Sequence, residues 1–461
     1  MKKAPDTFVI IFSIIVLAAL LTWVIPGGKY EKVAVDGKEW VDPASFHHVE
    51  SQPQGVGAIL TAPIRGVVDA ALIIGFVLIV GGAFGIFQKS GAVDAGIAHL
   101  VRLHDHSDFL KWATIPLFMI LFSLAGAVFG MSEELIPFVL IFIPLAIRLG
   151  YDSIAGVAVP FVGAGAGFAG AFLNPFTVGI AQGMAEIPLF SGIGYRLIVW
   201  TITTTIAILY VMRYAQKVKV SPQLSVCFDM DEVKREEHAQ DDLHSEQGLD
   251  MQHRLTLILF ALGMLVLVFG VLEFGWYIEE IAALFFALGI FIALVGRLSI
   301  SEMTGSFVDG AKDLVSTALL IGFARGILLI SQDGQIIDTM LFALSQWVGK
   351  FHPILASAWM FLVQTFINFF IPSGSGQAAL TMPIMAPLAD LVGVSRQTAV
   401  LAFQFGDGFS NLIIPTSAVT MGVLTIAKIS WTQWARWIYP LMLIFMLTSV
   451  LLLIPPYFIQ W

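Results

Sequence analysis

Long apolar stretches recur along the whole chain and are separated by short polar breaks. Several of them reach about 20 residues, the length that an α-helix needs to cross a lipid bilayer. The first runs from Phe8 to Ile25, follows Lys2 and Lys3, and has no small-residue cleavage site after it. The pattern predicts a first transmembrane helix that starts in the cytosol, rather than a cleaved signal peptide.

The residues that break the apolar stretches follow the same order in the two halves of the chain. When the first half is shifted so that Ser132 falls on Ser375, other Gly and Pro positions also coincide: Pro144 with Pro387, Gly150 with Gly393, Gly163 with Gly406 and Gly165 with Gly408. An internal repeat is therefore predicted. Each copy should hold a spanning helix (66–88, 313–332), an amphipathic stretch (92–104, 335–349) and two apolar segments joined at a polar tip.

The polar tips read "MSEEL" in the first repeat and "PSGSGQ" in the second, and no solvated loop surrounds either of them. Irregular backbone within a membrane is tolerated only where it is buried in protein or lines a wet cavity. We therefore predict two re-entrant hairpins, at about 112–149 and 353–392. A later helix of each repeat should also be broken, at Asn174-Pro175 and at Pro415-Thr416-Ser417.

The segment 216–254 interrupts this pattern, because it is rich in charge and poor in large apolar residues. It predicts a solvated, partly disordered cytosolic linker. The chain then divides into a first helix with an external loop (1–54), repeat 1 (55–215), the linker, a helical pair (255–300) and repeat 2 (301–461). With the first helix running outward, most of the 24 Lys and Arg residues fall in the cytosol. This places the first hairpin inside and the second outside, so the repeats are predicted to be inverted.

Composition supports the same class. The chain is 57% hydrophobic and 12% charged, whereas soluble proteins carry about 25% charged residues. An all-α polytopic membrane protein is predicted, with the bilayer and a small solute as partners and no nucleic acid. The single cysteine, Cys227, excludes an intramolecular disulfide. The chain has no Walker A loop and no His-Glu-x-x-His zinc motif, which disfavours ATP-driven transport and zinc enzymes.

Inverted repeats with broken helices are typical of secondary transporters. A helix end leaves N–H or C=O groups unpaired, and these groups can replace the hydration shell of an ion or a polar solute. The candidate solute-binding residues are the polar side chains at the tips and breaks: Ser132, Glu133, Glu134, Asn174, Ser373, Ser375, Gln377, Asp407, Asn411 and Thr416. A coupling sodium ion is expected near Ser132, Gly163, Gly165, Ser375, Gly406 and Gly408. A proton is the other candidate, and no further cofactor is expected.

Several of these residues also have plainer interpretations. Glu133 and Glu134 could be hydrated, or could cap the helix that returns from the tip. Asp407 could be the buried partner of Arg325, the basic residue placed in the middle of a predicted helix. The Gly-rich run at 163–172 could serve close helix packing or form an unwound ion-binding loop.

Two stretches, "MKKAPDTFVIIFSIIVLAALLTWVIPGGKYE" and "FIPSGSGQAALTMPIMAPLADLVGVSRQTAVLAFQFGDGFSNLIIPTSA", resemble the YfcC family of the DcuC group. That group belongs to the ion transporter superfamily, which includes the divalent anion/sodium symporters. The resemblance implies an elevator-type carrier, a homodimer, in which a transport domain slides along a scaffold. The symporters carry Ser-Asn-Thr at both tips, and this chain keeps only the serines, Ser132 and Ser375.

The acids at the first tip favour a solute with an ammonium group and one carboxylate. We therefore expect an amino acid, a basic one among the candidates, or a small peptide, moved by ion coupling or by exchange across the inner membrane. A C4-dicarboxylate carrier is the alternative, and an intramembrane enzyme or a channel is less favoured.

Overall fold

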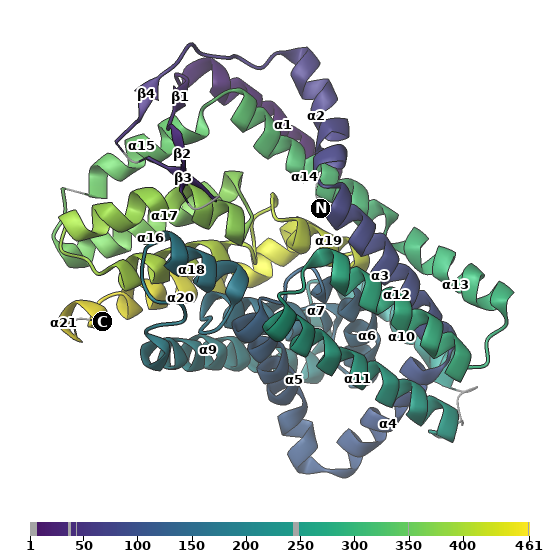
Figure 1. Cartoon of the computed structure of the whole chain (residues 1–461). Coiled ribbons are helices and arrows are strands. Elements are labelled where there is room, and N and C mark those ends of the chain that lie inside the picture. Colours follow the sequence, from purple (N-terminus) through teal and green to yellow (C-terminus); the bar gives the residue numbers. More distant parts are fainter. Residues whose placement is uncertain (1–6, 36–37, 43, 243–248, 349, 460) are drawn as a thin grey trace.

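The structure is a computed structural model that describes residues 7–35, 38–42, 44–242, 249–348, 350–459 and 461. These residues are mostly helical (Figure 1). Nine of the described helical segments are long and apolar enough to cross a membrane: α1 (Thr7–Val24), α3 (Ala71–Lys89), α5 (Asp108–Phe129), α9 (Ile193–Val220), α11 (Met251–Phe274), α12 (Ile278–Val295), α14 (Val315–Asp333), α16 (Pro353–Phe370), and α20 (Trp431–Leu452) with α21 (Pro455–Ile459). The prediction of an all-α polytopic membrane protein is confirmed.

Four short strands follow α1. Strand β1 (Gly28–Lys29) pairs with β4 (His47–His48), and β2 (Lys32–Val35) pairs with β3 (Lys38–Val41), both antiparallel. The backbone of this β segment is attached to α15 (Ile337–Val348), because the Tyr30 N–H donates to Asp338 Oδ2 at 3.0 Å. The β segment, which follows α1 directly, is therefore held against a helix of the second half of the chain.

The same series of helices occurs twice. The first series adds α2 (Val56–Asp69), α4 (Ala92–His106), α6 (Leu135–Arg148) and α7 (Ser153–Ala169) to α3 and α5. The second adds α13 (Ile300–Asp313), α15, α17 (Gly374–Leu391) and α18 (Arg396–Ser410) to α14 and α16. Helix α2 packs along α14, and α13 packs along α3 (Figure 1). This reciprocal packing is what two copies related by an approximate two-fold axis produce.

Glycines allow these helix pairs to approach closely. A methyl group added at Gly66 of α2 would overlap the carbonyl oxygen of Gly322 in α14, and one added at Gly167 of α7 would overlap the Ser123 carbonyl of α5. Such small-residue contacts let dispersion forces act between backbones inside a membrane.

Gly163 and Gly165 lie in the same uninterrupted helix α7, as Gly406 and Gly408 do in α18. The interpretation of 163–172 as an unwound loop is therefore wrong for 163–169, where close packing explains the glycines, whereas residues 171–174 lie outside any helix.

The segment expected to be a solvated linker is largely folded. A 3₁₀ turn (Pro222–Leu224) leads into helix α10 (Phe228–Asp242), whose Asp231 is fully buried. Asp231 accepts hydrogen bonds from the backbone N–H of Ser153 at 2.8 Å and from its hydroxyl at 2.5 Å. Burial among acidic groups raises the pKa of the Cys227 thiol. The prediction of disorder is wrong for 222–242, because buried polar contacts fix α10 to α7; residues 243–248 lie outside the described residues.

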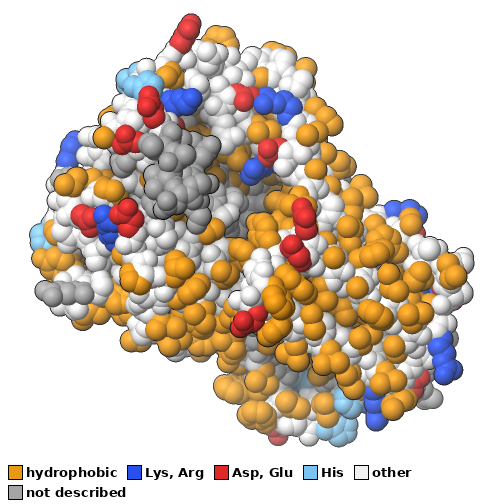
Figure 2. All heavy atoms as spheres, in the orientation of Figure 1, with side chains coloured by type: hydrophobic (Ala, Val, Ile, Leu, Met, Phe, Trp, Pro, Cys, Tyr) orange, Lys and Arg blue, Asp and Glu red, His pale blue; other side chains and the backbone are white. Residues whose placement is uncertain are grey.

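Apolar side chains dominate the outer surface. Figure 2 shows a broad apolar area over α11, α12 and α5, with few charged side chains within it. Leu265 and Phe269 of α11 and Phe291 of α12 are more than half exposed. An apolar area of this extent on isolated protein requires a covering phase, and the bilayer supplies it.

Candidate functional site

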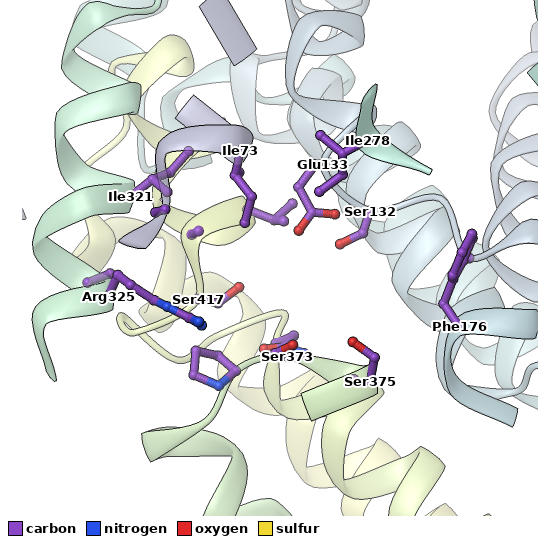
Figure 3. A pocket seen from close by; sticks show the side chains of 18 of the residues that line it. Ile73, Ser132, Glu133, Phe176, Ile278, Ile321, Arg325, Ser373, Ser375 and Ser417 are labelled. Carbon is purple, nitrogen blue, oxygen red and sulfur yellow. The ribbon is translucent and has the colours of Figure 1, made fainter. Parts of the chain in front are cut away.

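The tips of the two predicted hairpins meet in one cavity. The tip between α5 and α6 brings Ser132, Glu133 and Glu134, and the tip between α16 and α17 brings Ser373 and Ser375 (Figure 3). The cavity has a volume of about 150 Å³. Of the other predicted residues, Asn411 and Thr416 also line it. Seven of the ten candidate residues, which lie far apart along the chain, thus share one cavity.

Helix N-termini surround this cavity. Helices α6, α17 and α19 (Ala418–Ala427) begin at it, and the π-helical turn η1 (Pro175–Gly179) begins at Asn174 beside it. Ser373 and Ser417 each cap their helix by accepting a backbone N–H, and Asn174 Oδ1 accepts the Phe176 N–H at 2.9 Å. The first N–H groups of a helix lack intrahelical partners and carry partial positive charge. The backbone around the cavity therefore favours an anionic group such as a carboxylate.

The glutamates bring charge of the opposite sign. Glu134 Oε2 accepts the Ser132 N–H at 2.9 Å, which closes the tip on itself. Glu134 occupies the N-cap position of α6 but makes no side-chain capping hydrogen bond, so the capping interpretation is wrong for Glu134. Among the described residues, no Lys, Arg or His forms an ion pair with Glu133 or Glu134. Two acids thus line the cavity with no ion-pair partner among the described residues, and the Arg325 guanidinium that also lines it pairs with Asp69 instead.

Asp407 is a third acid close to the cavity. Its side chain is fully buried; Oδ1 accepts a hydrogen bond from Asn411 Nδ2 at 3.0 Å, whereas Oδ2 has no partner in the described structure. The alternative that paired it with Arg325 is wrong, because the Arg325 guanidinium pairs with Asp69 of α2. Buried carboxylate oxygens are normally hydrogen-bonded, and an unpaired one calls for a proton, a cation or a water molecule.

Three other buried polar atoms of residues at or beside the cavity also lack partners among the described residues: Thr177 Oγ1, Asn174 Nδ2 and Thr416 Oγ1. Thr177 and Asp407 both lie against Gly374, because a Cβ added there would be 2.5 Å from Thr177 Cγ2 and 2.9 Å from Asp407 Oδ2. Hydroxyl and carboxylate oxygens are ligands that hard cations take. Asp407 Oδ2 and Thr177 Oγ1 are oxygens of this kind without a described partner, whereas the carbonyls of Gly163, Gly165 and Gly406 lie within regular helices.

Gln377 does not contribute to the cavity. It is buried inside the second hairpin, where its Nε2 donates to the backbone and side-chain oxygens of Gln364 at 2.9 and 2.7 Å. Thr381 joins the same group through its contacts with Gln364. The structure thus places Gln377 away from the cavity that was predicted to hold it, and its amide links the two arms of the hairpin, α16 and α17.

Four contributing residues escaped the sequence reasoning. Phe176 and Thr177 follow the Asn174-Pro175 break, and Tyr277 precedes α12; all three line the cavity. The ring centroids of Phe176 and Tyr277 lie 5.0 Å apart, so the two rings are in contact. Asn368 of α16 donates to Ser410 Oγ at 2.7 Å and to Asn411 Oδ1 at 3.1 Å, which holds the end of α18 in place. An Asn within an apolar helix was the one available signal for such a role.

The chain is similar to known transport proteins over nearly its whole length. Residues 4–457 match the family described as C4-dicarboxylate anaerobic carrier, DcuC. The chain is 39% identical, over 97% of its length and 96% of the relative's, to the Escherichia coli (strain K12) protein named "Putative basic amino acid antiporter YfcC". It is 30% identical to an uncharacterized protein of Haemophilus influenzae, covering 98% of this chain and 96% of that protein.

Two solved transporters can be superposed on the chain. They are YdaH of Alcanivorax borkumensis (17% identity, 99% of both chains, TM-score 0.47) and MtrF of Neisseria gonorrhoeae (19% identity, 98% of this chain and 95% of that one, TM-score 0.45). Because both scores are below 0.5, the assignment rests on the sequence comparisons. With the family matched over residues 4–457 and a 39% identical relative covered almost completely, this chain belongs to the C4-dicarboxylate anaerobic carrier (DcuC) family, beside YfcC.

Proposed function

We propose that this protein is a secondary active transporter of amino acids, with basic amino acids or small peptides as its solutes. The observation that carries the proposal is the make-up of the cavity. Glu133 and Glu134 line it with no ion-pair partner among the described residues, and helix N-termini surround it. A solute with an ammonium group and one carboxylate would satisfy both, because each of its charges finds the opposite charge in the protein. The name of the 39% identical relative agrees with this solute class.

For the mechanism we propose an elevator. One wall of the cavity comes from α3, α12 and α14, through residues such as Ile73, Ile278 and Ile321, and the other comes from the two hairpin tips. The facing side chains of the first wall are largely apolar, so a second group of helices could slide along it with little loss of polar contacts. In this proposal α5–α10 and α16–α20 move with the solute, while α1–α3 and α11–α14 stay fixed. A homodimer in the inner membrane, with the N-terminus in the cytosol and the hairpins entering from opposite faces, belongs to the same proposal.

The coupling step is assigned to Asp407. Its unpaired Oδ2 lies beside Thr177 and the second hairpin tip. A sodium ion or a proton bound there would remove an uncompensated buried charge, which costs several kcal/mol per ion. Binding would also hold Gly374 against η1 and so favour a closed tip. Coupling then follows, because the ion and the solute stabilise the same closed arrangement.

A C4-dicarboxylate carrier is the second candidate, and two observations favour it. The family description names such carriers, and Arg325 lines the cavity. The three acids oppose it, because a dianion would bring two further negative charges close to Glu133, Glu134 and Asp407.

Uptake by purified protein in sealed proteoliposomes tests the proposal. Vesicles loaded with lysine, arginine or succinate are mixed with each radiolabelled solute, with and without sodium or proton gradients. We expect saturable uptake of lysine or arginine that unlabelled amino acids inhibit and succinate does not. Uptake of succinate without uptake of amino acids would replace this proposal with the dicarboxylate one. Conversion of the solute during uptake would indicate an enzyme.

A further inference from the structure

A second cavity adjoins the first, and Arg325 lies at the boundary between them. It has a volume of about 570 Å³ and is lined by Lys29 and Tyr30 of the β segment, by α14 and α15, and by one side of the second hairpin. Three residues line both cavities: Arg325, Leu328 and Ser373. A solute that passes from the larger cavity to the smaller one must therefore pass the Arg325 guanidinium.

Arg325 is held firmly at this boundary. It lies between Gly322 and Gly326 of α14, and added methyl groups at either glycine would press on α2, at Val67 and Ala62 respectively. The backbone of α14 around Arg325 is thus fixed against α2 by close packing. Figure 3 shows the Arg325 side chain reaching towards the cavity from α14, with Glu133 and Ser132 on the opposite side. The two charges face the cavity from different walls.

The ion pair between Arg325 and Asp69 can be opened. The side chains are 36% and 37% exposed, respectively, and half-exposed ion pairs contribute only about 0–1 kcal/mol to stability. A solute carboxylate can therefore displace Asp69 and take its place, because a guanidinium binds any carboxylate with the same paired geometry. An ammonium ion without a carboxylate would instead be repelled by the guanidinium, because both carry positive charge.

We propose that Arg325 is a specificity-determining residue that selects solutes bearing a carboxylate at the entrance to the cavity. The carboxylate of the selected solute replaces Asp69 as the partner of the Arg325 guanidinium. The solute then enters the smaller cavity with its ammonium group directed at Glu133. This inference deepens the proposed function, on which it rests. It predicts that the site rejects free polyamines, which the three acids alone would attract.

The test compares lysine with cadaverine, a diamine that has the alkyl chain and both amino groups of lysine but lacks its carboxylate. Inhibition of radiolabelled lysine uptake by each compound is measured in proteoliposomes with the unmodified protein and with Arg325→Gln. We expect the unmodified protein to prefer lysine by about 100-fold and Arg325→Gln to reduce this preference to about tenfold or less, as the loss of a charge-assisted hydrogen bond would do. An unchanged preference in Arg325→Gln would overturn the inference.

Arg65→Gln is the matched control. Arg65 pairs with Asp333 across the same two helices, at 2.5 Å, and lines neither cavity. It should keep the full preference for lysine, and an equal loss in both variants would indicate a general effect on α2–α14 packing and count against the inference.

If the unmodified protein transports only succinate, the proposed function fails separately. Arg325→Gln should then weaken succinate uptake about tenfold, and succinate uptake equal to that of the unmodified protein would overturn the inference in that case too. Uptake of neither solute would refute both.

Discussion

Asp407 lies directly behind Gly374 of the second hairpin tip, so that a Cβ atom on Gly374 would stand 2.9 Å from Asp407 Oδ2. The two residues come from α18 and from the start of α17. The absence of a side chain at Gly374 is therefore what lets the tip close over the unpaired carboxylate oxygen.

Replacing Gly374 by alanine should impair transport. The added methyl group would press on Thr177 Cγ2 at 2.5 Å and on Asp407 Oδ2, and overpacking of this kind costs about 1–3 kcal/mol. We expect the rate of uptake to fall at least about tenfold, with normal insertion into the membrane. Gly376→Ala is the control, because Gly376 is exposed at the same tip and its nearest neighbour, Ser373 Oγ, would be 3.2 Å away. Equal uptake by both variants would mean that the tip does not close on Asp407.

Replacing Asp407 by asparagine should abolish coupling. The amide keeps the shape of the side chain and removes the charge that a sodium ion or a proton would neutralise. We expect gradient-driven accumulation to disappear, while exchange of internal for external solute continues at a reduced rate. The measurement is uptake with imposed sodium and proton gradients in proteoliposomes.

Asp390→Asn provides the comparison, since Asp390 is half-exposed and pairs with Arg396 at 2.8 Å, at the other end of α17. It should leave accumulation unchanged. Continued accumulation by Asp407→Asn would show that the coupling ion binds elsewhere.

Removing the charge of either glutamate at the first tip should weaken the binding of cationic amino acids. Each of Glu133→Gln and Glu134→Gln loses a charge-assisted hydrogen bond to an ammonium group, which corresponds to an increase of about tenfold or more in the dissociation constant for lysine. Isothermal titration or competition uptake measures the constant. Glu279→Gln should have no effect, because Glu279 is exposed on α12 and does not line the cavity. If Glu133→Gln and Glu134→Gln both bind lysine as tightly as the unmodified protein, the assignment of the glutamates is wrong.

The folded linker should contribute to stability. Asp231→Ala would leave the buried Ser153 N–H and hydroxyl without their acceptor and would remove the charge that faces Lys234 at 3.7 Å. We expect a loss of about 1–3 kcal/mol, a lower midpoint of thermal unfolding in detergent, and faster proteolysis within 222–242. The neighbouring exposed residue supplies the control, Glu232→Ala, which should match the unmodified protein. An Asp231→Ala variant with unchanged protease resistance would argue against attachment of α10 through Asp231.

Much of this protein follows from the linear order of its residues. The length and spacing of apolar stretches determine a multi-pass helical membrane protein, because only a helix satisfies its own backbone in hydrocarbon. The positions of Pro, Gly and Ser mark the tips at Ser132 and Ser375, because these residues interrupt helices wherever they occur. The matching order of such residues indicates the repeat. The candidate residues were chosen at these interruptions, and seven of the ten lie together in one cavity.

Tertiary structure decided the remainder. Gly163 and Gly165 look the same in a sequence whether a helix unwinds or packs closely, and only the neighbouring helices, α5 and the chain after α18, show that they pack. Arg325 could have paired with Asp407, but the proximity of α2 gives it Asp69 instead. The charged linker looked solvated because composition reports average polarity, whereas one buried acceptor, Asp231, is enough to fix a helix to the core. Partner choice depends on distances between segments far apart in the chain, and local sequence does not contain them.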